Sequence, residues 1–150
     1  MATYSFLDVT ASITGPGGVV ALASSAGVAE EGITVEASQD KNKMIIGADG
    51  AGMHSLIADE SSEVSIKLLK TSPANSLLQG MLNYQTTSAV LHGKNHIVIV
   101  DTARGDNIIL NDVAFKKQPG LEYAKEGKFV EWKFEAIRTH TILGVGTPEL

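Results

Sequence analysis

The 150-residue sequence contains no cysteine, and its first forty residues contain neither lysine nor arginine. The missing cysteine excludes disulfide bonds, thiol nucleophiles and cysteine-ligated metal sites. The net charge of −5 comes from the acidic side chains of residues 1–40, because the other 110 residues balance 12 basic against 12 acidic groups. A protein that grips nucleic acid needs clustered lysine and arginine. This charge distribution therefore argues against ordinary nucleic-acid binding.

The sequence also lacks a long apolar run. No segment approaches the ~18 apolar residues that a membrane span needs. The N-terminus, MATYSFLDV, has neither the basic start nor the apolar stretch of a signal peptide. We therefore expect no membrane association and synthesis in the cytoplasm. The length suits a single domain covering residues 1–150.

Signatures of catalysis and of ligand binding are missing as well. The glycine clusters at 15–18 and 47–52 are not followed by the GK[ST] of a phosphate loop, and no serine lies in a Gly-x-Ser-x-Gly elbow. His92 and His96 have a zinc-like spacing, but a glycine and the start of a predicted strand between them would splay the rings apart. The tripeptide at 104–106, Arg-Gly-Asp, is interpreted as a turn. We predict no catalytic residue, no cofactor site and no metal site.

Alternating apolar and polar residues indicate strands through most of the chain. Residues 130–136 alternate most clearly, and the face of Trp132 and Phe134 is predicted to anchor the core. Residues 96–100 are apolar on both faces, which is typical of a central strand. The other predicted strands are 4–14, 19–22, 33–38, 64–68 and 107–117. The pattern predicts a mainly β fold, an antiparallel β-sandwich or barrel with one flanking α-helix.

The flanking helix is predicted to begin after Ser72, which can act as its cap, with Pro73 in the first helical position. Its apolar stripe consists of Leu77, Leu78, Met81 and Leu82. Gly80 weakens the helix interior by ~1 kcal/mol, so the helix should depend on docking against a sheet. We expect it to end between residues 84 and 87.

The segment 40–62 is a long excursion between two strands that each have one polar face, 32–40 and 62–70. Its three glycines at 47–52 predict a turn at its tip, with 44–46 and 53–58 pairing beside it. Such an excursion buries little by itself, so we interpret it as an arm that becomes ordered against a partner chain. Ordinary loop disorder is the alternative. The tail, 144–150, is predicted to be flexible.

A set of short motifs in fixed order resembles the tail tube (inner tube) proteins of contractile-tailed bacteriophages. No single motif is specific, but their order over some 130 residues is, and only 145–150 lies outside the resemblance. The motifs are Tyr4-Ser5-Phe6, Asp8-Val9, Gly15-Pro16-Gly17-Gly18, Gly27 to Thr34, Asp40 to Met44, Ile46 to Gly50, Gly52 to Ser55, Leu68 to Pro73, Ala103 to Asp106, Ala114 to Lys117, Tyr123 to Lys125 and Glu131-Trp132.

The resemblance implies a non-enzymatic, cofactor-free subunit that forms hexameric rings, which stack into a hollow conduit for DNA ejection. It implies a place in the virion tail after assembly in the host cytoplasm. The implied partners are further copies of the chain, the tail sheath, baseplate and tail terminator proteins, and the tape measure protein and DNA in the lumen. Contact with DNA would not be sequence-specific.

Paired strands are implied to line the lumen, and a long hairpin to reach the adjacent ring. The lumen-lining candidates are Thr34, Glu36, Ser38 and Lys67, with Lys67 expected to pair with Glu36 across strands. The inter-ring candidates are Met44, Ile45, Ile46, Asp49, Met53 and His54. Two other functions stay open: a tube protein of a phage-like bacteriocin or type VI secretion machine, and a soluble ligand-binding β-barrel.

Overall fold

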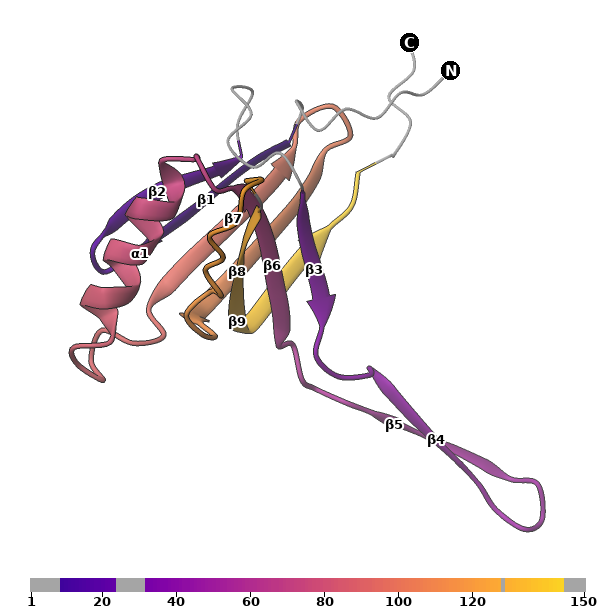
Figure 1. Cartoon of the computed structure of the whole chain (residues 1–150). Helices are drawn as coiled ribbons and strands as arrows, with labels where there is room; N and C mark the ends of the chain where they lie inside the picture. The colour runs from indigo at the N-terminus through magenta and orange to yellow at the C-terminus, as the bar shows by residue number, and fades with distance from the viewer. Residues whose placement is uncertain (1–8, 24–31, 128, 145–150) are drawn as a thin grey trace.

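The computed structural model describes residues 9–23, 32–127 and 129–144. They form a seven-stranded sheet in the order β2-β1-β7-β8-β9-β6-β3, a separate two-stranded hairpin and one helix (Figure 1). All neighbouring strands are antiparallel. The elements are β1 Val9–Gly15, β2 Gly18–Ala23, β3 Ile33–Ala37, β4 Asn42–Ile46, β5 Gly52–Leu56, β6 Ser62–Leu69, α1 Ala74–Gln85, β7 Asn95–Asp101, β8 Asp106–Phe115 and β9 Phe129–Ile142.

This architecture confirms the predicted fold class of antiparallel β-structure with one helix. The predicted strand 4–14 is present from Val9 onward, and its first five residues lie outside the described residues. The strand predicted at 96–100 is β7, which lies inside the sheet between β1 and β8. β9 continues to Ile142, six residues beyond the amphipathic stretch 130–136 from which it was predicted.

The large sheet curls into a half-barrel, and the pairing of β8 with β7 contains a β-bulge. Asn95 of β7 is opposite Val113 and Ile97 is opposite Leu110, so β8 has two residues, Asn111 and Asp112, where β7 has one. Asp112 has a φ of 54°, in the left-handed region that aspartate tolerates better than most residues. Extra residues of this kind bend strands and increase their twist. β9 changes direction sharply along its length in Figure 1.

The core lies on the inner side of the curl, where α1 covers β1 and β2 (Figure 1). Trp132 and Phe134 are buried in it, as predicted, and the ring of Phe115 packs 5.9 Å from the first and 4.9 Å from the second. The indole Nε1 of Trp132 donates a 3.0 Å hydrogen bond to Asn75 Oδ1. This bond connects the first turn of α1 to β9, because a buried indole N–H needs an acceptor.

The helix differs from its prediction at its start and on its buried face. Pro73, not Ser72, is the N-cap, and no side chain caps it; Ser72 Oγ instead accepts a 3.3 Å bond from the Ala74 N–H. The buried residues are Ala74, Leu78, Met81 and Gln85. Leu77 is exposed, so the predicted stripe was wrong there. The buried set has the 3.6-residue period of one helical face, whereas two adjacent leucines cannot both point at one sheet.

Candidate assembly surfaces

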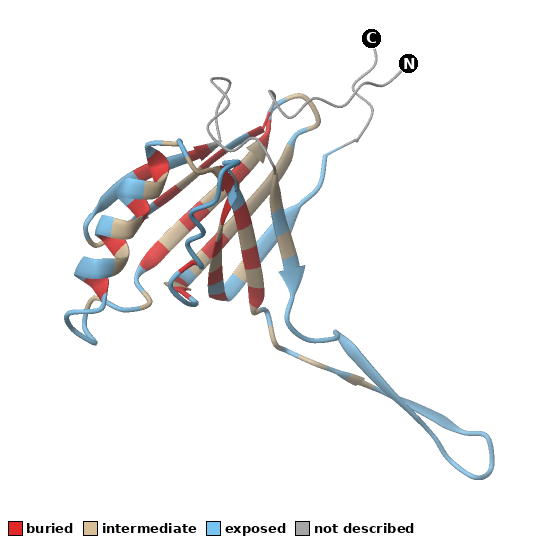
Figure 2. Cartoon of the chain, viewed as in Figure 1, coloured by how far each residue is buried: buried red, intermediate tan, exposed pale blue. Residues whose placement is uncertain are grey.

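The hairpin formed by β4 and β5, residues 42–56, projects away from the large sheet, and we call it the arm (Figure 1). Figure 2 shows it exposed along nearly its whole length, and only Ser55 is partly buried. A turn closes its tip, where Gly47 N–H donates a 2.7 Å bond to Ala51 O and Gly50 N–H a 3.0 Å bond to Gly47 O. The arm is thus a regular hairpin that buries almost none of its own side chains.

All six inter-ring candidates lie on the arm. Met44 is opposite His54 and Ile46 is opposite Gly52, so these residues share one face. Ile45 and Met53 are directly opposite each other on the other face, where they are 50% and 57% exposed. Asp49 lies in the tip turn and accepts a 3.1 Å bond from the Ala51 N–H. Both faces therefore carry exposed apolar side chains, while Asp49 has a local role in the turn.

The base of the arm is joined to the sheet by polar contacts. Lys41 Nζ donates to the backbone oxygen of Asp59, and Lys41 O accepts a 3.0 Å bond from the Ile57 N–H. Ser61 N–H donates a 2.8 Å bond to Asp59 Oδ1, and the pKa of Asp59 is lowered, chiefly by a hydrogen bond from the Ser61 side chain. These bonds lie between the β3–β6 pair and the arm. They therefore fix the direction in which the arm leaves the sheet.

The sheet face opposite the core carries charge along β3, β6 and β9, and we call this the charged face. Its members are Thr34, Glu36, Glu63, Ser65, Lys67, Lys116, Glu131, Lys133 and Glu135. Glu36 is opposite Glu63, and Glu63 is opposite Glu135, so three carboxylates form one row across three strands. Lys116 Nζ lies 3.1 Å from Glu63 and offsets part of the repulsion that like charges produce at opposite positions.

Of the lumen-lining candidates, Thr34, Glu36 and Lys67 lie on the charged face. Ser38 follows β3 and lines a hollow of about 760 Å³ beside Glu135. The predicted pairing of Lys67 with Glu36 was wrong. Lys67 Nζ lies 3.9 Å from Glu131 on the neighbouring strand, because the register of β3 and β6 places Glu63 opposite Glu36.

A second concave surface lies at the other end of β3 from the arm, and we call it the cleft. It has a volume of about 260 Å³. Its lining is mainly aliphatic with two carboxylates: Val9, Ile33, Val35, Ile99, Ile108, Asp101 and Asp106. Ile33 is the first residue of β3, whereas the arm follows its last residue, Ala37. The strand therefore separates the cleft from the arm.

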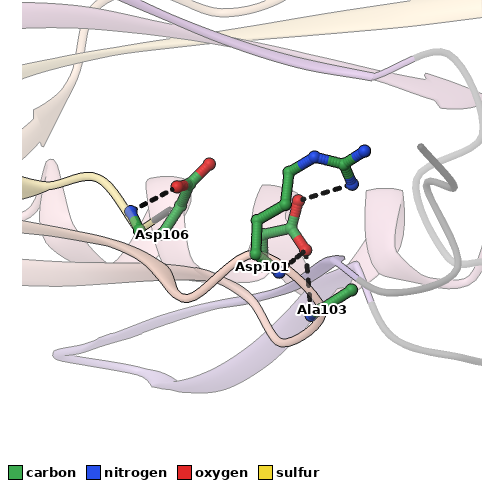
Figure 3. A network of polar contacts seen from close by, with 5 residues as sticks. Asp101, Ala103 and Asp106 are labelled. Carbon is green, nitrogen blue, oxygen red and sulfur yellow. Dashed lines mark hydrogen bonds and ion pairs between the residues drawn. The ribbon is translucent and has the colours of Figure 1, made fainter. Parts of the chain in front are cut away.

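The rim of the cleft is a turn stabilised by its own carboxylates (Figure 3). Asp101 Oδ1 accepts bonds of 3.1 Å from the Ala103 N–H and 3.2 Å from the Arg104 N–H, and Arg104 Nη1 lies 3.8 Å from Asp101 Oδ2. Asp106 Oδ1 accepts a 2.9 Å bond from the Gly144 N–H. The Arg-Gly-Asp tripeptide is thus a structural turn, as predicted, with Gly105 at a φ of 80°.

Sequence reasoning identified the arm but missed the cleft and most of the charged face. The alternation at 130–136 was read for its apolar side alone, although its polar side supplies Glu131, Lys133 and Glu135 to the charged face. Nothing local could have revealed the cleft, because its residues come from β1, from β3 and from the β7–β8 hairpin, which are distant from one another in the sequence.

No group of three or more histidine and carboxylate side chains suited to a metal ion occurs in the described ranges. His96 instead bonds through Nδ1 to Asn111 Oδ1 at 2.6 Å. Among the described helical residues, no stretch is long and apolar enough to cross a membrane.

A curled sheet with a charged outer face and a protruding apolar arm defines a structural subunit of a larger assembly. The chain belongs to the family of the Bacteriophage PhiTE tail tube protein, whose family model matches residues 1–144. This confirms the resemblance found in the sequence and assigns the chain a structural role in a phage tail tube. No curated protein matches the sequence.

Solved structures show the same fold. A chain in the cryo-EM structure of the anti-feeding prophage cap, the tube-terminating cap, is 10% identical with a TM-score of 0.57, covering 96% of this chain and 95% of that one. A chain in the sheath–tube complex of the PVC extracellular contractile injection system, in its extended state, is 11% identical with a TM-score of 0.57 and coverages of 94% and 92%. A chain in the anti-feeding prophage baseplate is 8% identical with a TM-score of 0.53 and coverages of 100% and 99%.

Proposed function

We propose that the protein forms hexameric rings that stack into the inner tube of a contractile phage tail, and that this tube conducts DNA during ejection. It acts as one structural domain, residues 1–150, with an inter-ring arm at about 40–62; the tail predicted to be flexible, 144–150, lies outside the described residues from 145 onward. It is not an enzyme and binds no cofactor. Its partners are its own copies, the sheath, baseplate and terminator proteins, and the tape measure protein. It assembles in the host cytoplasm and resides in the virion.

The observation that carries the conduit function is the carboxylate row of Glu36, Glu63 and Glu135 on the charged face. A conduit must not retain its cargo, and carboxylates repel the phosphates of DNA. The charged face as a whole has four glutamates against three lysines, so its net charge is −1. In a ring, six such faces directed inward produce a wall that is polar and mildly acidic.

Ring formation is supported by the two edges of the large sheet. Among the described residues, β2 pairs only with β1 and β3 only with β6, so each edge strand presents unpaired backbone groups. Such edges pair readily with another chain. Because the edges differ, a contact between them is head-to-tail, and head-to-tail contacts close into rings when the rotation allows.

The arm supplies the contact between rings. Its apolar side chains, among them Met44, Ile46 and Met53, are more than half exposed, so no other described part of the chain covers them. A neighbouring ring that covers them removes apolar area from water at ~25 cal/mol per Å². The arm projects from the sheet end next to β3 and β6, away from the helix (Figure 1).

The test is electron microscopy of the purified protein and of a variant lacking residues 44–58. The wild-type protein should form tubes of uniform diameter, and the deletion should leave a folded monomer or ring without long tubes. Val90→Ser is the matched control, since it removes an exposed apolar side chain outside the arm and should leave the tubes intact. Tubes of normal length from the deletion variant would contradict the arm's role.

A reconstruction of the tube then tests the orientation of the charged face. Thr34, Glu36, Ser38 and Lys67 should point into the lumen. If Glu36 is buried between subunits or lies on the outer wall, the conduit argument fails even though the tube forms.

A tube of an injection machine without a capsid is the second candidate, favoured by the likeness in fold to chains of contractile injection systems. DNA inside tubes isolated from the native source supports the phage tail, and its absence together with the lack of a neighbouring capsid gene supports the machine. A soluble ligand-binding barrel predicts a monomer at high concentration in size-exclusion chromatography.

A further inference from the structure

We propose that the cleft receives the arm of a second copy of this chain, through the arm face that carries Ile45 and Met53. This inference rests on the proposed stacking of rings and names the site at which one ring receives the next. The arm and the cleft lie at opposite ends of β3, so one subunit presents a donor at one end and an acceptor at the other. Such a head-to-tail contact repeats indefinitely along one axis.

The chemistry of the two surfaces matches on one arm face only. Ile45 and Met53 are directly opposite each other, and Lys43 lies two residues before Ile45 on the same face. The cleft offers aliphatic walls and, at its rim, the partly exposed carboxylate of Asp106, whereas Asp101 is buried and paired with Arg104. Apolar side chains therefore meet apolar walls while the ammonium group of Lys43 meets the carboxylate of Asp106. The other arm face carries His54 and Asn42, which bond to each other at 3.0 Å, and has no lysine.

The cleft is also large enough. A cavity of roughly 150 Å³ holds a benzene-sized group, and the cleft has about 260 Å³. It therefore accommodates one or two aliphatic side chains without rebuilding the sheet. The hydrogen-bonded turn at 101–106 holds the rim in place, so the acceptor is formed before the arm arrives. A preformed acceptor lowers the ordering cost of the contact.

Disulfide trapping tests the inference, and the chain is suited to it because it has no native cysteine. One preparation carries Met53→Cys alone and another Val35→Cys alone. After the two are mixed, assembled and mildly oxidised, non-reducing gels should show a cross-linked dimer that neither preparation forms alone. Met44→Cys mixed with Val35→Cys is the matched control from the opposite arm face, and should give at least a tenfold lower yield.

The outcomes separate this inference from the proposed function. Tubes with the Met53–Val35 cross-link support both. Tubes in which this cross-link is absent, or is no stronger than the Met44 control, overturn the cleft as acceptor while the tube function stands. Failure of the wild-type protein to form tubes overturns the proposed function itself. A cross-link between Val35→Cys and Ser5→Cys of the same chain would assign the cleft to the segment that precedes Val9, and would also overturn the inference.

Discussion

The side-chain amides of Gln85 and Asn95 form a reciprocal pair in the core, each donating a 2.7 Å hydrogen bond to the other. Both residues are 1% exposed. Gln85 Nε2 also donates a 2.8 Å bond to Pro16 O in the β1–β2 turn. The pair therefore joins the last residue of α1, the first residue of β7 and the first hairpin in one network.

Breaking this pair on one side should be costly, because the remaining amide would stay buried without a partner. We expect Gln85→Leu to lower the free energy of unfolding by about 1–3 kcal/mol, measured by urea denaturation. The double variant Gln85→Leu/Asn95→Leu should lose less than the sum of the two single variants. Gln79→Ala, in the more exposed amide pair with Gln118, should stay within about 0.5 kcal/mol of wild type. Equal losses at the two sites would contradict the network.

The segment that follows β9 should not tolerate a side chain at Gly144. A Cβ there would overlap the backbone oxygen of Arg104, in the turn that forms the rim of the cleft. Because backbone atoms cannot move aside cheaply, Gly144→Ala should lower the melting temperature by several degrees, which corresponds to about 1–3 kcal/mol. Gly120→Ala is the control, since a Cβ at that position meets nothing. A melting temperature equal to that of the control would show that β9 does not close against this turn.

Alanine in place of Gly80 should stabilise the protein, in contrast to alanine in place of Gly144. It lies in the exposed part of α1, and a Cβ at this position meets no atom within 4 Å. Replacing a helical glycine by alanine removes an entropic penalty of about 0.8–1 kcal/mol. Gly80→Ala should therefore raise the free energy of unfolding by that amount in urea denaturation, with tube formation unchanged. A loss of stability would mean that the helix position is crowded.

The curl of the sheet should depend on the left-handed conformation of Asp112. Asparagine adopts this conformation as readily as aspartate, whereas a β-branched residue does not. We expect Asp112→Asn to be close to neutral and Asp112→Val to lose about 1–3 kcal/mol, compared by thermal unfolding. Similar stabilities for the two variants would show that the bend of β8 and β9 does not require this residue.

Acid should weaken the base of the arm. The hydrogen bond from the Ser61 side chain is the main cause that lowers the pKa of Asp59. Because the folded pKa is below the unfolded one, the carboxylate contributes stability above the unfolded pKa and loses it as pH falls through the folded pKa. Ser61→Ala should move the pKa of Asp59 upward toward its ordinary value in an NMR titration of the carboxyl carbons. An unchanged pKa would exclude the Ser61 hydroxyl as the main cause.

The sequence alone determined which residues lie on which side of the strands whose residues alternate between apolar and polar. The alternation at 130–136 was enough to predict Trp132 and Phe134 in the core, since a strand presents successive side chains to opposite faces. Glycine clusters located the turns, and the long glycine-tipped excursion between two strands with one polar face identified the arm. These are local properties, set by the backbone over a few residues.

Only the tertiary structure decided which strands are neighbours and in what register. The placement of β1 beside β7 brings together segments about ninety residues apart, and the cleft results from that pairing. Register likewise placed Glu63, not Lys67, opposite Glu36. Gln85 is polar, yet it is buried in the core because its side-chain amide bonds to Asn95 and to Pro16 O. Periodicity specifies which face of a strand a residue occupies but not which strand pairs with it. Contacts between strands that are distant in the sequence therefore cannot be predicted from periodicity.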